Sequence, residues 1–260
     1  MTTLHALNRS SHQEYGYSPP RQKVSETEYW EKYYNSSDVV YEWNNGYLEE
    51  KAMSDFSTIL VYDWFLELLG YFLKSHPIGK KTFLEMGFRL NLPGETDIRK
   101  PDLAVVLNDN PEPILPDDKT YQGIFDFCVE VLSDSTAEIK KRDTVTKKKE
   151  YAMCGVKEYY ILDARREQTQ FYRLGKKGVY IPIKPVKGDI IKSKVLPGFQ
   201  FRISDLFRKP SPEEMINDKV YQDFVLPRYT QEKRARKKAE QRIKQLAEKL
   251  RELGVDPDKI

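Results

Sequence analysis

Three short apolar runs constrain the fold of this chain most strongly. They span Leu103–Leu107, Phe125–Leu132 and Glu158–Leu162, and each is about as long as one strand. A run of this kind bounded by turn residues is typical of a buried strand. Two segments, 55–73 and 138–153, carry apolar residues at helical spacing. The order of helix, strands, helix, strand and hairpin predicts one domain of the α/β or α+β class.

Shorter signals complete the expected secondary structure. Asn45-Gly46 separates two strand-like runs and predicts a hairpin over 41–50, because glycine supplies the positive φ of a tight turn. Alternating apolar residues over 82–92 predict a single strand. A short helix is expected at 27–35, and meander strands are expected at 168–174, 179–183 and 190–195.

Composition divides the chain into three parts. We expect residues 1–24 to be a flexible polar leader, residues 25–208 the folded domain, and residues 209–260 a charged helical tail. No stretch approaches the roughly 18 apolar residues of a membrane span, so no membrane partner is expected. Cys128 and Cys154 stand alone in apolar surroundings. This indicates buried free thiols and a reducing, cytoplasmic compartment.

The positive charge of the chain is concentrated near its C-terminus. The net charge of +3 is too small to indicate a nucleic-acid partner by itself. Residues 231–254 hold nine Lys or Arg against four Glu, a charge of +5, which leaves −2 for the rest of the chain. The folded domain is therefore not a uniformly basic particle.

Two acidic residues and one lysine are the candidate site. Asp102 precedes one apolar run and Glu130 lies near the end of the next, so both are expected at strand ends on one side of the sheet. Mg²⁺ prefers one or two carboxylates together with waters and phosphate oxygens. Asp143, Lys147 and Tyr151 follow at four-residue spacing, which places them on one helix face. A lysine beside the metal would stabilise the charge that develops on a phosphate.

Each of these residues also has a structural interpretation. Asp102 fits a strand cap or a turn, and Glu130 requires a cation or solvent because charged side chains are seldom buried unpaired. Lys147 fits a solvated helix face, or a surface ion pair with Asp143 that contributes little stability. The histidines do not support zinc or triad chemistry, since they lie in the leader or directly before Pro77, at His5, His12 and His76.

A set of short motifs, ordered along most of the chain, resembles one known family. The motifs are Val40-Tyr41-Glu42-Trp43 with Gly46 and Met53-Ser54, Arg99-Lys100-Pro101-Asp102-Leu103-Ala104-Val105-Val106, Val129-Glu130-Val131-Leu132-Ser133, Asp143 with Lys147 and Tyr151, and Gly155-Val156-Lys157-Glu158-Tyr159-Tyr160-Ile161-Leu162-Asp163. Over roughly residues 25–208 they are similar to those of the Uma family of restriction endonucleases. That family belongs to the PD-(D/E)XK nuclease superfamily.

The resemblance implies a restriction-endonuclease-like fold, with a central mixed sheet flanked by helices. It implies a Mg²⁺- or Mn²⁺-dependent endonuclease acting on DNA, in which Asp102 and Glu130 hold the metal and are catalytic together with Lys147. The superfamily pattern places a lysine two residues after the second acid, where this chain has Leu132. Lys147 on the following helix is the expected substitute. Relatives often have a histidine near Ser57, a position to which we assign no role.

Two classes of function therefore remain open. One is a metal-dependent DNA endonuclease, and the other is a nucleic-acid-binding or interaction module on a nuclease-like fold with little turnover. The fold by itself does not decide between them.

The tail has a signal of its own. Ala239, Ile243, Leu246, Leu250 and Leu253 follow the 4-3-4-3 spacing of a short coiled-coil seam. Two to three heptads are marginal alone, so the seam needs the domain or a second copy to pack against. A homodimer through this helix, a solvated charged helix, and a basic face along a nucleic-acid backbone are the three interpretations.

Overall fold

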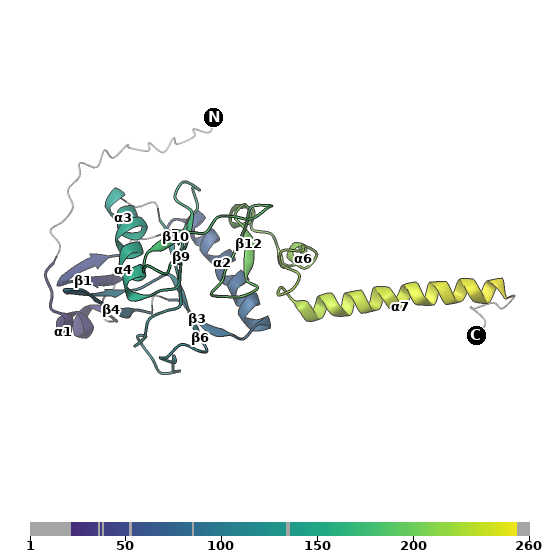
Figure 1. Ribbon diagram of the computed structural model, residues 1–260, viewed down its shortest axis with the longest axis horizontal. Helices are drawn as coiled ribbons and strands as arrows, with labels where there is room; N and C mark the ends of the chain where they lie inside the picture. The colour runs from purple at the N-terminus through teal and green to yellow at the C-terminus, as the bar shows by residue number, and fades with distance from the viewer. Residues whose placement is uncertain are drawn as a thin grey trace, which may run out of the picture.

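The computed structural model describes most of the chain. The described residues are 22–35, 37, 39–51, 54–84, 86–133 and 136–253 (Figure 1). Most of the leader expected at 1–24, together with Met53 and the last residues of the tail, lies outside the described residues. The described part forms a packed body from which one long helix projects (Figure 1).

A mixed six-stranded sheet forms the centre of the body. Its order is β10-β9-β8-β7-β6-β3, with β7 and β8 parallel and the other neighbours antiparallel. The three predicted apolar runs form its adjacent strands β6, β7 and β8. The strands are β3 (Gly79–Thr82), β6 (Leu103–Leu107), β7 (Phe127–Leu132), β8 (Glu158–Asp163), β9 (Gln170–Leu174) and β10 (Tyr180–Pro182).

A second sheet of four strands was not expected from the sequence. Its order is β2-β1-β5-β4, formed by β1 (Tyr41–Asn44), β2 (Tyr47–Glu50), β4 (Phe88–Leu92) and β5 (Glu95–Arg99). The predicted hairpin is confirmed as β1 and β2, with a positive φ at Gly46. The single strand expected at 82–92 is wrong, because the chain leaves the six-stranded sheet after Thr82 and enters the second sheet at Phe88.

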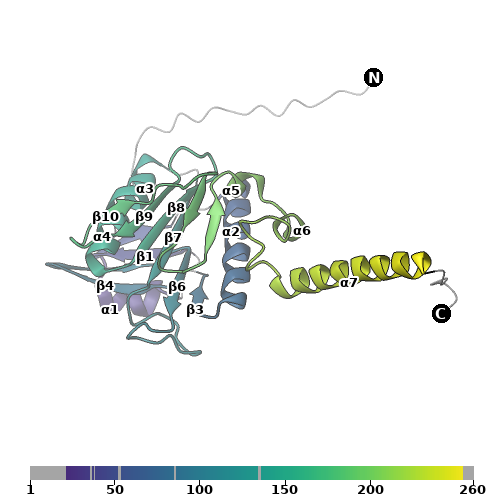
Figure 2. The same ribbon diagram turned by 45° about the vertical axis from the view of Figure 1, so that its right-hand side comes forward.

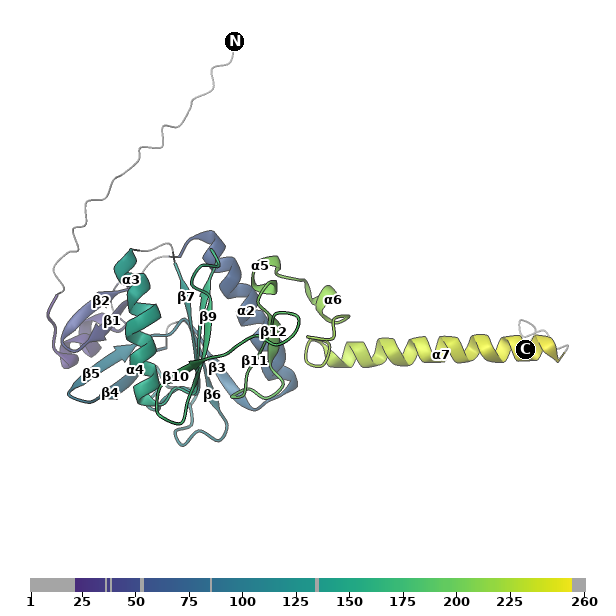
Figure 3. The ribbon, with the colours of Figure 1, turned by 45° about the horizontal axis from the view of Figure 1, so that its top comes forward.

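Helices cover both faces of the six-stranded sheet (Figures 2 and 3). One face carries α2 (Phe56–Ser75), with α5 (Asp205–Arg208) packed against it. The helix expected at 138–153 is confirmed on the other face, with a π-helical turn, η2, in its middle. The remaining elements are α1 (Glu26–Glu28), η1 (Tyr29–Tyr33), α3 (Ala137–Lys141), η2 (Arg142–Thr146), α4 (Lys147–Cys154), β11 (Ile190–Lys192), β12 (Gln200–Arg202), α6 (Pro212–Met215) and α7 (Pro227–Glu252).

The alternation of side chains along β7 produces two apolar cores. Phe127 and Val129 face the cluster that contains α2, whereas Cys128 and Leu132 face the cluster that contains Tyr151 of α4. Successive residues of a strand point to opposite faces of its sheet. Glu130 has the parity of the second group, so its carboxylate is directed toward α4.

Helix α2 is the core helix of the first cluster. Among the described helices it alone has the length and apolar character of a membrane span, and residues along much of its length are buried. Phe65, Leu68, Leu69 and Phe72 are fully buried against the sheet. This burial identifies α2 as the core helix of the fold.

The packed body continues beyond residue 208, where the sequence placed the start of the tail. Met215, Tyr221 and Phe224 are buried in the same cluster as α2. Among the described elements, α7 alone projects away from the body (Figure 3). Ile243 and Leu246 of the expected seam are exposed on it, so its packing against a second copy stays a prediction.

Arg99, the last residue of β5, joins the second sheet to α4. Its Nε and Nη2 each donate a hydrogen bond to Glu150 of α4 at 2.7 Å. Its Nη1 donates to Glu49 at 2.6 Å and to Glu42 at 3.4 Å. Glu42 and Glu49 are directly opposite each other on β1 and β2, an arrangement in which like charges repel. The guanidinium between them offsets this repulsion.

Replacing Arg99 with methionine tests this role. Arg99→Met removes the cation that the buried carboxylates of Glu42, Glu49 and Glu150 share, and we expect the free energy of unfolding to fall by about 3–5 kcal/mol. Urea denaturation followed by circular dichroism measures the change. Arg236→Met, at an exposed arginine paired with Glu240 on α7, is the matched control and should change stability by less than about 0.5 kcal/mol. Equal effects of the two substitutions would contradict the assignment.

Asp97 makes stability depend on pH. Burial raises the pKa of Asp97 to about 7, with Arg99 acting in the opposite direction and Glu150 adding to the rise. The usual pKa is 3.8, so between these values the folded chain holds one proton more than the unfolded chain. The stabilisation that protonated Asp97 gives the folded chain is complete below pH 3.8 and is lost as the pH rises through about 7.

Between pH 5 and pH 8, we therefore expect the free energy of unfolding of the wild type to fall by about 1–3 kcal/mol relative to that of Asp97→Asn. Denaturation at a series of pH values measures this difference. Asp117→Asn, in an exposed loop, is the control and should give a difference that does not vary with pH. A flat profile for Asp97→Asn would contradict the shifted pKa.

Candidate active site

The antiparallel pairing of β6 and β7 brings the two predicted acids together. Leu103 pairs with Val129, so Asp102 and Glu130 lie at the same end of adjacent strands. Asp102 Oδ2 accepts a hydrogen bond from the backbone N–H of Val131 at 2.7 Å. Asp102 is thus held against β7 as a strand cap, one of its two predicted roles. Its side chain is 23% exposed, so it also remains open to solvent.

Glu130 lies deeper than Asp102. Its carboxylate is buried, with Oε1 3.1 Å from Lys147 Nζ and accepting a hydrogen bond from the Tyr151 hydroxyl at 2.9 Å. Both partners come from α4, one turn apart, which is the helix face predicted from the spacing. The predicted trio is therefore brought to one end of the sheet, with Asp102 at the surface and Glu130 beneath it.

Lys147 is the centre of the buried charges. Its Nζ lies 3.0 Å from Glu42, 3.1 Å from Glu130 and 3.0 Å from Asp143, and its side chain is 0% exposed. The interpretation of Lys147 as part of a solvated helix face is therefore wrong. Its pair with Asp143 is present, but as part of a buried cluster rather than a surface ion pair. The π-helical turn η2 carries Asp143 and ends directly before Lys147.

Burial and the local charges shift the pKa values of these groups in different directions. Burial raises the pKa of Glu130 to about 8; Lys147 acts against the rise and Asp102 adds to it. Burial alone would raise the pKa of Glu42, but Lys147 and Arg99 outweigh it and lower that pKa below its usual range. Burial would lower the pKa of Lys147, but its three carboxylates raise it instead. Lys147 therefore stays protonated, whereas Glu130 takes up a proton more readily than an ordinary glutamate.

Sequence reasoning missed two residues of the site, Glu42 and Lys51. Glu42 comes from β1 of the second sheet and contacts Lys147, so the site lies where the two sheets meet. Lys51 follows β2, and its Nζ lies 2.8 Å from Asp102 Oδ1 and 2.7 Å from the carbonyl oxygen of Lys100. A glutamate between the aromatic residues Tyr41 and Trp43 is a signal that could have indicated a buried role for Glu42. Lys51 directly follows Glu49 and Glu50 at the end of β2, and nothing in this local sequence indicates a role in the site.

The buried ion pairs carry an excess of negative charge. Together they connect four cationic side chains to seven carboxylates, which leaves a formal charge of −3. The cations are Arg99, Arg142, Lys51 and Lys147, and the acids are Glu42, Glu49, Asp97, Asp102, Glu130, Asp143 and Glu150. Buried negative charge of this kind is relieved by protonation or by a bound cation.

The residues present fit a two-carboxylate cation site. Among the described residues no cluster of three or more His, Cys, Asp or Glu suited to a metal occurs. Mg²⁺ does not need such a cluster, because it usually retains waters and takes only one or two protein carboxylates. Asp102, which is open to solvent, and Glu130, whose charge is disfavoured by burial, are the donors that fit this description.

A cavity of about 400 Å³ opens beside Asp102. It is lined by Val40, Ser54, Thr58, Ile59, Tyr62, Leu84, Asp102 and Val131. The walls are therefore mainly apolar, with Asp102 as the acidic group among them. Helix α2, the end of β7 and the segment between the two sheets contribute to the walls of the cavity.

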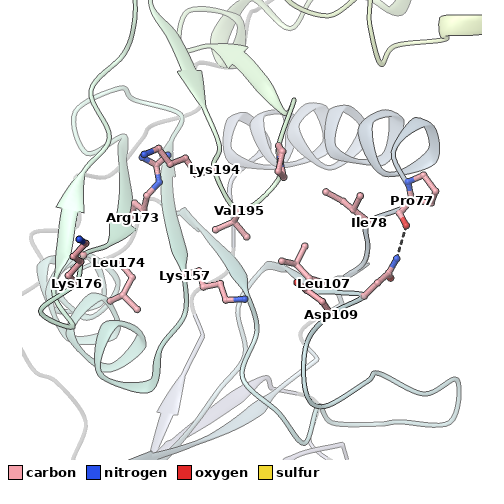
Figure 4. A pocket seen from close by; sticks show the side chains of 13 residues that line it. Pro77, Ile78, Leu107, Asp109, Lys157, Arg173, Leu174, Lys176, Lys194 and Val195 are labelled. Atoms are coloured by element: carbon pink, nitrogen blue, oxygen red, sulfur yellow. Dashed lines mark hydrogen bonds between the residues drawn. The ribbon is translucent and has the colours of Figure 1, made fainter.

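A larger cavity of about 820 Å³ lies at the opposite end of β6 (Figure 4). Lys157 and Arg173 contribute to its lining, but each is already ion-paired, with Asp126 at 2.7 Å and Glu158 at 2.8 Å respectively. Its lining holds a single acidic residue, Asp109, and no pair of carboxylates among the described residues. The smaller cavity is thus the one that adjoins Asp102, the exposed member of the acidic pair.

Comparisons with known proteins identify the fold and the family of the chain. A solved structure from Anabaena variabilis, described as a putative nuclease belonging to DUF820, is 14% identical in sequence with a TM-score of 0.55, over 70% of this chain and 97% of that chain. At this identity the likeness establishes a shared fold, which confirms the expected nuclease-like architecture. No match was found among curated proteins. The family model described as "Uma2: Putative restriction endonuclease" matches residues 26–204, so the chain belongs to the Uma2 family.

Proposed function

We propose that the protein is a metal-dependent DNA endonuclease that uses Mg²⁺ or Mn²⁺ and hydrolyses phosphodiester bonds beside Asp102. The observation that carries this proposal is the buried excess of negative charge at a strand end that opens to solvent through Asp102. Membership of a restriction-endonuclease-like family supports a nuclease, and nucleic acid as its substrate.

Asp102 and Glu130 would hold the metal. When bound, the metal supplies a water of lowered pKa as nucleophile and neutralises charge on the phosphate. The hydrogen bond from the Val131 N–H fixes the Asp102 carboxylate, and the Tyr151 hydroxyl fixes that of Glu130. Both acids are therefore oriented by the fold before any substrate arrives.

The two lysines have different roles in this proposal. Lys147 is fully buried among three carboxylates, so it positions Glu130 and does not reach a substrate. Lys51 contacts the more exposed acid, Asp102, next to the cavity. We therefore place Lys51 nearest the phosphate, where its ammonium stabilises the charge that develops during cleavage.

A binding module without turnover is the second candidate. The observation in its favour is that both acids already have a lysine partner, Lys51 for Asp102 and Lys147 for Glu130. A metal must compete with the ammonium of Lys51 for the Asp102 carboxylate. Cleavage assays separate the two candidates.

Substitution of the acids is the first test. We expect Asp102→Asn and Glu130→Gln each to reduce Mg²⁺-dependent cleavage of single-stranded or duplex DNA by at least about 100-fold, because each removes charge from the metal site. Gel analysis of labelled DNA over a Mg²⁺ titration measures the rates. Asp109→Asn, at the cavity on the opposite end of the sheet, is the matched control and should retain full activity. Metal-dependent cleavage that survives both substitutions would overturn the site.

Substitution of the lysines tests their different roles. Lys147→Met should lower the free energy of unfolding by about 3–5 kcal/mol, because it removes the buried cation that Glu42, Glu130 and Asp143 share. Lys51→Met should cost less than about 1 kcal/mol, because Asp102 is open to solvent, yet reduce cleavage at least about tenfold. Denaturation and cleavage rates are measured on the same preparations. Full activity in Lys51→Met would exclude Lys51 from the reaction.

A further inference from the structure

Exposed apolar side chains occur in the three segments that contribute apolar residues to the cavity beside Asp102, and we call this set the apolar rim. It consists of Val39, Val40, Phe56, Ile59, Phe83 and Leu84. Val40, Ile59 and Leu84 line the cavity itself, and the other three lie beside them in the sequence or one helical turn away. Phe56 is 73% exposed and Leu84 is 85% exposed, although both are large apolar side chains. A patch of this kind beside a polar site is typical of a binding surface.

The backbone of two segments presents the rim toward solvent. Phe56 and Ile59 are three residues apart at the start of α2, so they are neighbours on one face of the helix. Leu84 lies in the crossing between the two sheets and has a φ of 58°, in the left-handed region. That conformation is costly for a residue with a branched side chain, and such strain is frequent at functional sites.

The cavity lacks the groups that bind a duplex backbone. None of the described residues that line it is a lysine or an arginine. Recognition of duplex DNA depends on such side chains at the phosphates. Lys51, the cation beside the cavity, is engaged with Asp102. The surface therefore suits an apolar, flat group that lies next to a phosphate, rather than a row of phosphates.

We propose that the apolar rim and its cavity bind an unstacked nucleobase adjacent to the scissile phosphate, so that the substrate is single-stranded DNA or a single-stranded branch of a duplex. This inference rests on the proposed function. A nucleobase has an apolar face that packs on apolar side chains, and enzymes that admit one base take it out of the stack. The cavity volume of about 400 Å³ lies within the roughly 300–1,000 Å³ of sites that hold small ligands.

A hydroxyl group in the cavity can contact the edge of a base. The Tyr62 hydroxyl, which is only partly buried, donates to the carbonyl oxygen of Asp102 at 3.2 Å. Its oxygen can also accept a hydrogen bond from an N–H group. Since every base carries such groups, this arrangement accepts different bases and gives little sequence specificity.

The experiment compares one labelled oligonucleotide in three forms: single-stranded, as a duplex with its complement, and as a duplex with a single-stranded flap. Cleavage is measured with Mg²⁺, and binding is measured by fluorescence anisotropy in EDTA. The double variant Phe56→Ala/Ile59→Ser removes exposed parts of the rim. Ile181→Ser, at an exposed isoleucine of β10 outside the rim, is the matched control.

We expect the wild type to cleave the single-stranded and flapped forms at least about tenfold faster than the duplex. The double variant should bind single-stranded DNA at least about fivefold more weakly, as the loss of one stacking contact implies, whereas Ile181→Ser should bind like the wild type. Equal cleavage of all three forms, or unchanged binding by the double variant, would overturn the inference.

Two outcomes separate this inference from the proposed function. Cleavage of the duplex with no preference for single strands retains the nuclease and overturns the role of the rim. Rim-dependent binding of single-stranded DNA with no metal-dependent cleavage retains the role of the rim and overturns the nuclease. If the double variant changes only the elution volume in size-exclusion chromatography, the rim is a contact between protein chains and the inference is overturned.

Discussion

The ammonium of Lys147 is the interaction on which the rest of the structure depends. It contacts Glu130 of the six-stranded sheet, Glu42 of the second sheet and Asp143 of the turn before α4, all within 3.1 Å. One buried cation therefore joins two sheets and a helix. Burial of an unpaired charge is costly, so the buried position of Lys147 is stable only with its carboxylate partners in place. Arg99 acts in the same way, because it joins Glu49 of the hairpin to Glu150 of α4.

The same cluster links folding to function. Residues that hold the sheets together are those that orient Glu130, so the acids cannot be altered without a cost to stability. The network nevertheless carries more carboxylates than cations, and burial raises the pKa of both Glu130 and Asp97. A cluster that served stability alone would gain from balanced charge. The excess of carboxylates, together with an acid that is open to solvent at Asp102, is consistent with a site that accepts a further cation.

Much of the fold follows from the sequence because its central strands are short, apolar and bounded by turns. β6, β7 and β8, the hairpin of β1 and β2, and helix α2 all follow from local pattern. The second sheet does not, since β5 (Glu95–Arg99) is mostly polar, and its buried Asp97 and Arg99 are held by ion pairs that include residues distant in the sequence. Asp102, Glu130 and Lys147 could be predicted as a group, whereas Lys51 could not, because its contact spans 51 residues with no local signal.

The two cavities differ in the charge of the side chains that line them. At one end of the six-stranded sheet, lysine and arginine side chains line a wide cavity; at the other end, apolar side chains surround Asp102. A nuclease that acted on continuous duplex would place its cations around the acids, because phosphates on both sides of the cut need neutralisation. Here the lysines nearest the acids are each paired with a carboxylate, Lys51 with Asp102 and Lys147 with Glu130, and the lining of the adjoining cavity is mainly apolar. That division favours a substrate whose bases, rather than its backbone, are presented to the protein.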